Sequence, residues 1–364
     1  MKTAIILPHR EQFSVRNAGA IALSLAAQLT KEHVNNLNVE LWGDPLMGCS
    51  LAPHVLFKPL VPFWWHVGRQ RWRYKQAILQ ALKEEACPIR LEIHNRAILF
   101  KQLADYSIPL ALYLHNDPIT IRGLKTVAER MMVLNRADYV VCVSDFLRDR
   151  FCNGVPSSLC KNVFVIPNTL DFSYFDTWTI KQKEILFVGR LIHDKGVIPL
   201  IHALQLVLPK FPEWSARFIG AQYFGQIKPR SPYEFELLNI VEQTLAGRVH
   251  FDWYQPYSVV AEAFNRAAIT VVPSLWDEPF GRTALEGMAA GCAVIASNRG
   301  GLAGVVGGAG VLVEPTANCI AAALSKLMSS DAYCKRVGAD CAERARMVFG
   351  AAFINTEINK IRAN

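Results

Sequence analysis

Several features that mark whole classes of proteins are missing from this sequence. No apolar run approaches the roughly 18–20 residues of a membrane-spanning helix, and the run in MKTAIILPHR is too short for a signal peptide. Short repeats and low-complexity tracts are absent as well. We therefore expect a globular cytoplasmic protein, or one held on the inner face of the cytoplasmic membrane by its surface alone.

The chain also lacks the spacings of metal sites and dinucleotide sites. Its nine cysteines are scattered without a C-x-x-C pair, which indicates reduced thiols, and no His, Cys and Asp group has ligand spacing. The P-loop pattern GxxxxGK[ST] is absent, and GGLAG (300–304) does not fit GxGxxG followed by an acidic residue. We expect no bound metal and no cofactor, and a dinucleotide enzyme is disfavoured.

What the chain does have is apolar residues and positive charge. Hydrophobic residues make up 51% of its 364 residues and charged residues 19%, which suits two well-buried domains. The net charge is +8, and residues 1–181 hold 21 Lys and Arg against 15 Asp and Glu, whereas the remainder holds 18 against 16. Phosphates, acidic lipids and nucleic acid are therefore candidate partners of the first half.

Apolar, β-rich runs alternate with helical segments along the chain. Nearly every position of these runs is apolar, which predicts strands buried on both faces of parallel sheets. The predicted strands are 3–8, 37–43, 89–95, 109–115, 138–144, 162–168, 184–190, 215–221, 248–253, 268–274, 292–297 and 310–315. The predicted helices are 17–30, 69–86, 121–136, 145–152, 196–208, 233–246, 257–266, 281–290, 317–328, 331–347 and 351–362.

This alternation predicts an α/β protein with two doubly wound, Rossmann-like domains that face each other across a cleft. We expect an N-terminal domain at 1–171, a linker at 172–183 and a C-terminal domain at 184–348. A last helix, at about 349–364, is expected to pack back on the first domain. Such sheets bind ligands at the carboxyl ends of their strands, so functional residues should follow strands.

Two motifs of the second half fit that expectation. Arg190 and Lys195 flank a turn between a strand and a helix start, an arrangement that suits a diphosphate or is simply solvated. Glu278 lies in the loop after the strand 268–274, and Glu286 lies in the next helix. Carboxylates accept pairs of hydroxyl hydrogen bonds from sugars, although a lone glutamate is more often a helix-dipole partner or a solvated residue.

Together these motifs carry a family resemblance. FVGRLIHDKG followed by VVPSLWDEPFGRTALEGMAAGCAVIASNRGGL resembles the retaining GT-B glycosyltransferases of family GT4, strongly over 160–315 and more weakly before it. Glu278 and Glu286 match that family's Glu-x7-Glu element. The resemblance implies that Arg190 and Lys195 hold the donor diphosphate, that Glu278 binds sugar hydroxyls and that Glu286 binds the ribose. The implied donor-binding set is Gly19, Arg190, Lys195, Gly220, Glu278, Phe280, Gly281, Arg282 and Glu286.

The resemblance also assigns residues of the first half. His115, directly after the strand 109–115, is similar to the histidine that stabilises charge beside the donor sugar, so the implied catalytic residues are His115, Glu278, Arg190 and Lys195. Asp117 either orients His115 or begins the next turn. Glu92 and Arg96 face an acceptor or are hydrogen-bonded strand-end residues, and His9 and Arg10 are further candidates. The expected acceptor-binding residues are Arg16, Asn17, His94 and Asn95.

Three departures from the family pattern are present. Trp253 stands where glycine is common before the nucleobase loop, Gly304 stands where a glutamate is usual, and the linker motif reads PNT (167–169) rather than PNG. The first affects the nucleobase contacts, and the second removes a charge near the donor phosphates.

The stretch PFWWHVGRQRWRYKQ (62–76) concentrates aromatic and basic side chains. Alone, it suits nucleic acid, a membrane surface or a packed helix. Parallel strands need a crossover helix here, which we place at 70–85 with Trp72, Ile78, Leu79 and Leu82 buried. The remainder is a candidate contact with an anionic membrane or a lipid-linked acceptor, unless it simply packs, and its key residues are Phe63, Trp64, Trp65 and Arg69.

We therefore expect a retaining, metal-independent glycosyltransferase. Its donor is expected to be a nucleotide-diphosphate sugar, UDP-linked, and its acceptor a bacterial surface glycan such as lipopolysaccharide core, exopolysaccharide or a lipid-linked oligosaccharide. A sugar-nucleotide epimerase of related fold and a non-enzymatic nucleic-acid-binding protein are the alternatives, and a glycosidase is disfavoured because hydrolysis needs no phosphate site. Nucleic acid is not expected as a partner.

Overall fold

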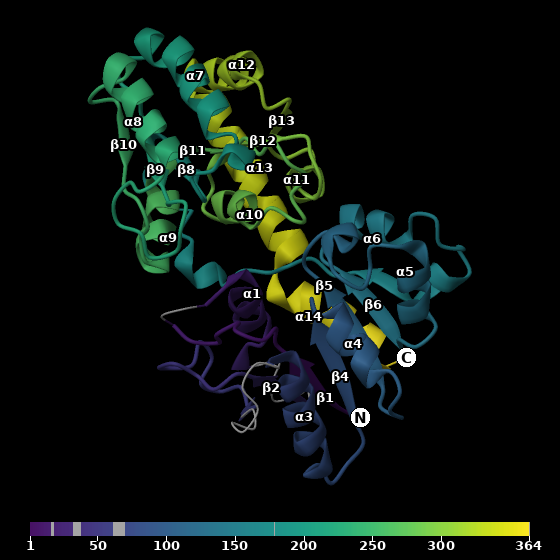
Figure 1. Ribbon diagram of the computed structural model, residues 1–364. Coiled ribbons are helices and arrows are strands. Elements are labelled where there is room, and N and C mark those ends of the chain that lie inside the picture. The colour runs from purple at the N-terminus through teal and green to yellow at the C-terminus, as the bar shows by residue number, and fades with distance from the viewer. Residues whose placement is uncertain (16–17, 32–37, 61–69, 178, 364) are drawn as a thin grey trace. The chain divides into compact units, whose positions relative to one another are not determined.

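The computed structural model describes the chain except for residues 16–17, 32–37, 61–69, 178 and 364 (Figure 1). The chain divides into two compact units, which we call unit 1 (Met1–Leu170 with Ala351–Asn364) and unit 2 (Asp171–Gly350). Several residues named above lie outside the described ones, namely Arg16, Asn17, Phe63, Trp64, Trp65 and Arg69.

Unit 1 is built on a parallel sheet with the strand order β3-β2-β1-β4-β5-β6-β7. Its strands are β1 (Lys2–Ile6), β2 (Val39–Gly43), β3 (Phe57–Pro59), β4 (Ile89–His94), β5 (Leu110–Leu114), β6 (Tyr139–Cys142) and β7 (Val163–Val165). Its helices are α1 (Ala20–Gln28), α3 (Gln70–Lys83), α4 (Ala97–Leu103), α5 (Val127–Leu134), α6 (Asp145–Cys152) and α14 (Ala351–Ala363). β4 and β5 are buried along their whole length, as central strands of a parallel sheet should be.

Unit 2 repeats the architecture with the strand order β10-β9-β8-β11-β12-β13, again all parallel. Its strands are β8 (Gln182–Val188), β9 (Ser215–Ile219), β10 (Val249–Phe251), β11 (Ala267–Val272), β12 (Ala293–Ser297) and β13 (Val311–Val313). Its helices are α7 (Val197–Val207), α8 (Pro232–Thr244), α9 (Tyr257–Arg266), α10 (Arg282–Ala289), α11 (Leu302–Val306), α12 (Ala317–Met328) and α13 (Asp331–Phe349).

The prediction of two doubly wound α/β domains is confirmed. β3, α4 and α11 were not predicted, and each is short. β8 begins at Gln182, so the end of the expected linker at 172–183 lies within a strand of unit 2. None of the described helices is long and apolar enough to cross a membrane.

The helix α3 is held on unit 1 by a different face from the one predicted. Its buried residues follow the helical period, and they are Tyr74, Ala77, Ile78 and Ala81. The prediction was right for Ile78 and wrong for Leu79 and Leu82, which are only partly buried, whereas the side chain of Trp72 lies outside the described part of the chain. The Tyr74 hydroxyl donates to the Leu7 carbonyl over 2.8 Å, so this aromatic residue of the 62–76 stretch is part of the scaffold.

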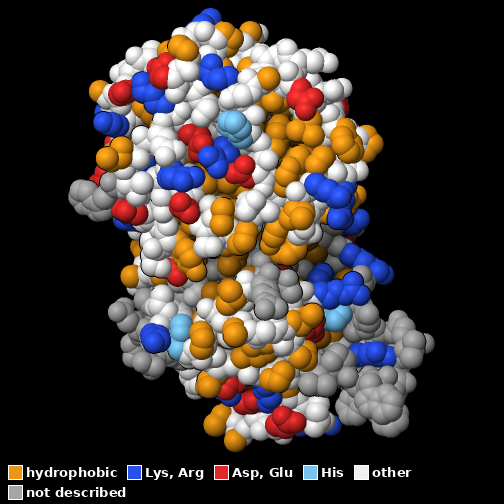
Figure 2. All heavy atoms as spheres, turned by 90° about the vertical axis from the view of Figure 1, so that its left-hand side faces the viewer, with side chains coloured by type: hydrophobic (Ala, Val, Ile, Leu, Met, Phe, Trp, Pro, Cys, Tyr) orange, Lys and Arg blue, Asp and Glu red, His pale blue; other side chains and the backbone are white. Residues whose placement is uncertain are grey.

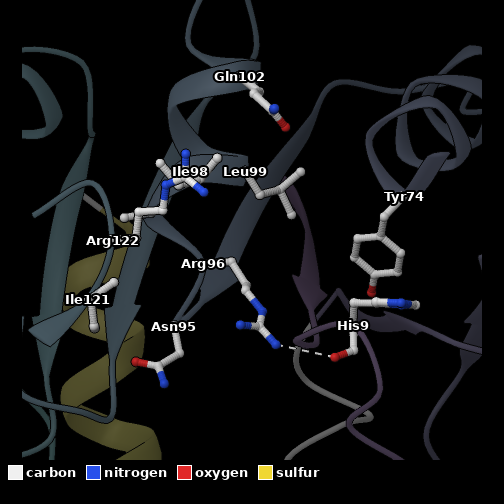
Figure 3. A pocket seen from close by; sticks show the side chains of 10 residues that line it. His9, Tyr74, Asn95, Arg96, Ile98, Leu99, Gln102, Ile121 and Arg122 are labelled. Carbon is white, nitrogen blue, oxygen red and sulfur yellow. Dashed lines mark hydrogen bonds between the residues drawn. The ribbon is translucent and has the colours of Figure 1, made fainter. Parts of the chain in front are cut away.

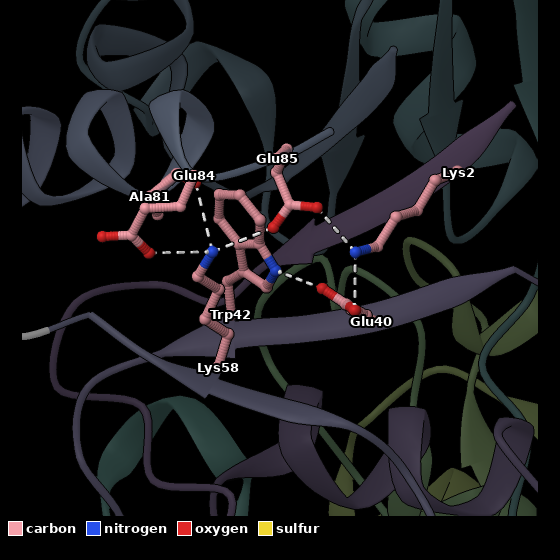
Figure 4. Close-up of polar contacts among 7 residues, drawn as sticks. All are labelled: Lys2, Glu40, Trp42, Lys58, Ala81, Glu84 and Glu85. Carbon is pink, nitrogen blue, oxygen red and sulfur yellow. Dashed lines mark hydrogen bonds and ion pairs between the residues drawn. The ribbon is translucent and has the colours of Figure 1, made fainter. Parts of the chain in front are cut away.

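Ion pairs join the segment after α3 to the strands β1, β2 and β3 (Figure 4). Glu85 accepts from Lys2 at 2.7 Å and from Lys58 at 2.9 Å, and these hydrogen bonds hold the pKa of Glu85 below its usual value. Lys2 also pairs with Glu40 at 2.6 Å, and the Trp42 indole donates to Glu40 at 3.1 Å. The network links β1, β2 and β3 to the segment that follows α3.

A buried ion pair joins α14 to the centre of the first sheet. The Arg362 guanidinium donates to both oxygens of Glu92 on β4, at 2.7 and 2.6 Å, and Glu92 is 0% exposed. Three isoleucines of α14 pack beside Tyr113 and Tyr139, and they are Ile354, Ile358 and Ile361. The last helix therefore belongs to unit 1, beside β5 and β6 (Figure 1).

Replacing Arg362 by methionine should destabilise unit 1 strongly. The change leaves the Glu92 carboxylate buried without a cation, which costs about 3–5 kcal/mol of unfolding free energy. Urea unfolding measures the loss, with Lys360→Met on the same helix as the control, since Lys360 is exposed and, among the described residues, pairs with Glu357 alone. Equal unfolding midpoints for the two variants would show that the pair does not hold α14.

Candidate functional site

The loops after β8 and β11 meet at the switch point of the second sheet. β8 and β11 are neighbours, and the chain runs outward from β8 to β10 before it returns to β11. The Leu275 amide donates to the Asp194 carbonyl over 2.8 Å. Gly196 has a φ of +68°, and a Cβ there would lie 1.8 Å from the Pro273 carbonyl oxygen, so only glycine permits this approach. The two loops are therefore joined backbone to backbone.

Two predicted residues come together at this point. The ammonium of Lys195 forms an ion pair with the carboxylate of Glu278, which lies one loop away. The Ser274 hydroxyl donates to the same carboxylate oxygen over 2.6 Å, and Lys195 lies 5.1 Å from the centroid of the Trp276 ring. Glu278 is 8% exposed, so it is not the solvated loop residue of the simpler interpretation.

Hydrogen-bond donors near the Lys195–Glu278 pair are available to a ligand. Arg190 is exposed, and its side chain has no ion pair with a described residue. No side chain caps the amino-terminal end of α10, which follows Gly281 at a φ of +107°. The Phe280 side chain packs against Phe349, at a ring distance of 5.8 Å, and only its backbone is left for a ligand. This edge of the sheet thus offers cations and amides suited to an anion.

Glu286 is held by two neighbours. Its Oε1 accepts from Arg282 Nε at 2.9 Å and from the Tyr257 hydroxyl at 3.2 Å. Burial raises the pKa of Glu286, and the Arg282 guanidinium acts in the opposite direction. Glu286 is therefore not solvated, and Arg282, predicted to bind the donor, serves in the structure as the partner of Glu286.

The loop after β10, which the resemblance places beside the nucleobase, has a glycine-like backbone although it lacks the glycine. Trp253 has a φ of +46°, the left-handed region that a bulky residue rarely adopts. Its carbonyl accepts from the Gly220 amide over 2.7 Å, and a Cβ on Gly220 would lie 2.0 Å from the Gly189 carbonyl oxygen. The Trp253 ring stacks on Phe251 at 5.7 Å. Trp253 thus adopts a backbone conformation that glycine reaches freely, and it adds a ring to this loop.

Unit 1 places His115 at the carboxyl end of β5, next to His94. The His115 Nε2 and His94 Nδ1 atoms are 2.9 Å apart, and Tyr113 stacks on the other side of His94 at 4.4 Å. The His115 amide donates to the Asn95 side chain over 3.2 Å. Burial lowers the pKa of His115 to about 4, against a hydrogen bond with Asn168 that raises it. His115 is therefore neutral at neutral pH.

Some expectations for unit 1 need correction. His94 is 1% exposed and lies behind His115, so it positions that residue and cannot touch an acceptor as predicted. Asp117 caps the turn at Pro118–Thr120 and pairs with Arg150 at 3.1 Å, so it begins the turn. Glu92 is the buried partner of Arg362, not an acceptor ligand.

The glycine at the start of α1 faces a carboxylate. A Cβ on Gly19 would lie 2.4 Å from Glu11 Oε1, and that oxygen accepts from the Ala22 amide at 3.2 Å. A donor-binding role for Gly19 stays a prediction. Gly304, by contrast, would accommodate a side chain, because a Cβ there meets nothing within 4 Å. Packing therefore does not explain why position 304 lacks the glutamate that is usual in the family.

Comparison with known proteins assigns the second half of the chain. Residues 175–345 match the family Glycosyl transferases group 1. This segment, slightly less than half of the chain, is similar to that family. YtcC of Bacillus subtilis is 26% identical to this chain over 252 residues, 64% of this chain and 61% of YtcC, so less than two thirds of that relative is spanned. Spore coat protein SA of the same species is 27% identical over 308 residues, 76% of this chain and 78% of the relative.

A solved structure extends the similarity to both units. Anabaena HepE, in complex with UDP and glucose, matches this chain with a TM-score of 0.76 at 18% identity and covers 100% of each chain. At that identity the likeness shows the fold, and the predicted GT-B fold is confirmed. The segment 175–345 is thus similar to a family of glycosyl transferases, which are transferases.

The sequence did not reveal three residues that shape the site in the group 1 segment. Ser274 and Trp276 lie between β11 and Glu278, where their position after a strand was the available signal. Tyr257 starts α9 and reaches Glu286 across 29 positions of sequence, and no local pattern marks it.

Acid should destabilise unit 1 through His115. Its pKa is 6.5 when unperturbed and about 4 in the folded chain, so the unfolded chain binds more protons between these values. The unfolding free energy should therefore fall as the pH drops from 6.5 towards 4. The difference between wild type and His115→Gln in urea unfolding isolates this contribution. A difference that stays constant across that window contradicts the assignment of a depressed pKa.

Proposed function

We propose that this protein is a retaining glycosyltransferase that moves a hexose or N-acetylhexosamine from a UDP-sugar to a bacterial surface glycan, such as lipopolysaccharide core or a lipid-linked oligosaccharide. The observation that carries the proposal is the Lys195–Glu278 pair at the switch point of a group 1 segment. A lysine suits the diphosphate and a carboxylate suits sugar hydroxyls. The UDP and glucose bound by HepE support the choice of donor.

Different residues of unit 2 bind different parts of such a donor. Lys195 and Arg190 stabilise the charge that develops on the leaving diphosphate, and the first amides of α10 add donors to the same region. These groups take the part that a metal ion plays in other phosphate sites. Glu278 binds the sugar hydroxyls, and Glu286, oriented by Arg282, binds the ribose.

Retention is accounted for by attack of the acceptor hydroxyl on the face from which the diphosphate leaves, with the leaving phosphate taking the proton. His115 is neutral at neutral pH and its ring contacts His94 and Asn168, so in this scheme it lies beside the sugar without carrying charge. No covalent intermediate on the protein is needed.

The alternatives gain no support from the structure. On the face in Figure 2, acidic and basic side chains are interspersed, which is unlike the basic stripe expected for nucleic-acid binding. Glu278 and Glu286 are each paired with a cation, whereas a glycosidase needs one of its carboxyls free to protonate the leaving group. An epimerase of related fold is distinguished from a glycosyltransferase by its product, which is a free sugar nucleotide and not a glycoside.

Glu278→Ala tests the donor site. The melting temperature of the wild type is measured with UDP-glucose, UDP-N-acetylglucosamine and GDP-mannose in turn. We expect one of the UDP-sugars to raise it. Loss of the carboxylate should lower transfer by about a hundred-fold or more, as for other groups that act at the transition state. Glu262→Ala, which removes an exposed carboxylate of α9, is the matched control. Full activity of Glu278→Ala would contradict the role given to this carboxylate. If no sugar nucleotide of the panel stabilises the wild type, the proposal of a nucleotide-sugar donor is wrong.

Membrane contact through Phe63, Trp64, Trp65 and Arg69 is a further part of the proposal. Aromatic and basic residues together suit an anionic lipid surface. Co-sedimentation with vesicles of anionic and of neutral lipid should show binding to the anionic vesicles alone, reduced in the Trp64→Ala/Trp65→Ala variant. Equal sedimentation of variant and wild type removes this segment from the proposal.

A further inference from the structure

A pocket lies at the switch point of the first sheet (Figure 3). β1 and β4 are neighbours there, and the chain runs outward from β1 to β3 before it returns to β4. His9 follows β1, Asn95 and Arg96 follow β4, and Arg122 comes from the loop before α5. The cavity measures about 120 Å³. This is the position at which doubly wound sheets bind ligands.

The described residues that line the pocket carry positive charge and no carboxylate. Two of them, Arg96 and Arg122, are exposed arginines. Arg96 donates one N–H to the His9 carbonyl over 3.2 Å, which fixes the side chain and leaves its other N–H groups free. Arg122 has no hydrogen bond or ion pair with a described side chain. Guanidinium groups with free donors are suited to phosphate and carboxylate.

The nearby acids are already engaged. Asp44 accepts from His9 Nδ1 at 2.9 Å and from the Arg10 amide at 2.6 Å. Glu11 accepts from the Ala22 amide at the start of α1; burial raises the pKa of Glu11, and the charge of Arg96 acts in the opposite direction. Neither carboxylate lines the pocket or forms an ion pair with Arg96, so the guanidinium N–H groups of the two arginines are available to a ligand there.

His9 adds to the pocket a ring nitrogen that has no hydrogen-bond partner among the described residues. Asp44 holds the Nδ1 side of the ring, whereas Nε2 is buried and has no hydrogen-bond partner. In the neutral ring, a proton on Nδ1 shared with Asp44 leaves Nε2 as an acceptor for a hydroxyl. Tyr74 lies beside His9 (Figure 3), and their ring centroids are 5.5 Å apart. The Tyr74 hydroxyl already donates to the Leu7 carbonyl.

The pocket is connected to His115. The Asn95 side chain, which lines it, accepts the His115 amide proton through Oδ1 and keeps its amide N–H groups for a ligand. Apolar side chains complete the wall, and they are Ile98, Leu99 and Ile121. A sugar ring has apolar faces and hydroxyl edges, so this wall and His9 suit it.

We propose that this pocket binds an oxyanion, phosphate or carboxylate, carried by the acceptor sugar. Arg96 and Arg122 hold the oxyanion, and His9 accepts a hydroxyl of the same sugar. The acceptor is thus a phosphorylated or acidic sugar unit, not a neutral one. The identification of the ligand as the acceptor rests on the proposed glycosyltransferase function.

Equilibrium dialysis with glucose 6-phosphate, glucuronate and glucose tests the pocket on the full chain. We expect at least one of the anionic sugars to bind about ten-fold or more tightly than glucose, because charged hydrogen bonds to arginine are strong. Preference for glucose 6-phosphate identifies a phosphate site, and preference for glucuronate a carboxylate site. No preference for either over glucose overturns the proposal.

Substitutions place the binding in this pocket. Arg96→Gln and Arg122→Gln should each weaken the anionic sugar by about ten-fold, and Arg148→Gln, which removes an exposed arginine of α6 paired with Asp145 and Asp149, should not. Thermal unfolding checks that the variants fold. Unchanged binding in Arg96→Gln/Arg122→Gln overturns the proposal.

Stabilisation by UDP is measured in parallel and separates the two claims. If UDP-sugars bind but anionic sugars do not, the acceptor pocket is wrong and the donor site stands. If anionic sugars bind through Arg96 and Arg122 but no sugar nucleotide binds, the oxyanion site stands and the glycosyltransferase proposal is wrong.

Discussion

The Glu92–Arg362 pair is the contact on which the arrangement of unit 1 depends. A carboxylate in the middle of a buried strand is costly unless a cation reaches it, and here the cation comes from the last helix of the chain. The pair also fixes the carboxyl end of β4, since Glu92 lies two residues before His94 on the same face. His94 contacts His115, and the next residues, Asn95 and Arg96, line the pocket. A stabilising contact of α14 thereby sets the geometry of the functional edge.

Most of the fold could be predicted from local patterns, because parallel strands are apolar throughout and helices repeat with a period near 3.6. The elements that were missed are those too short for such a pattern. α4 has seven residues, and its buried Ala97, Phe100 and Leu103 span barely two turns. β3 has three residues, and none of them is fully buried. For α3 two apolar stripes fit the helical period equally well, and the hydrogen bond from the Tyr74 hydroxyl to the Leu7 carbonyl shows which of them is buried.

The site was predictable where its residues are close in sequence and unpredictable where contacts are distant. Arg190, Lys195, Glu278 and Glu286 follow strands and were found by motif, but the partners that define their state lie up to 83 positions away. The error at His94 has the same origin. A polar residue at a strand end signals function or packing equally, and only the sheet shows that this face of β4 lies beneath His115 and Tyr113.

The Lys195–Glu278 pair shows how such a site can be stable before it is filled. Each charge would be costly at this largely buried point if it stood alone, and each neutralises the other while Ser274 holds the carboxylate in place. In the proposed function, a sugar nucleotide supplies both replacements at once, a diphosphate for the lysine and hydroxyls for the glutamate. Such binding exchanges the partners of both side chains and adds the negative charge of the diphosphate to the site. The glycine at position 196 makes this possible, since only there can the two loops approach closely enough for the pair to form.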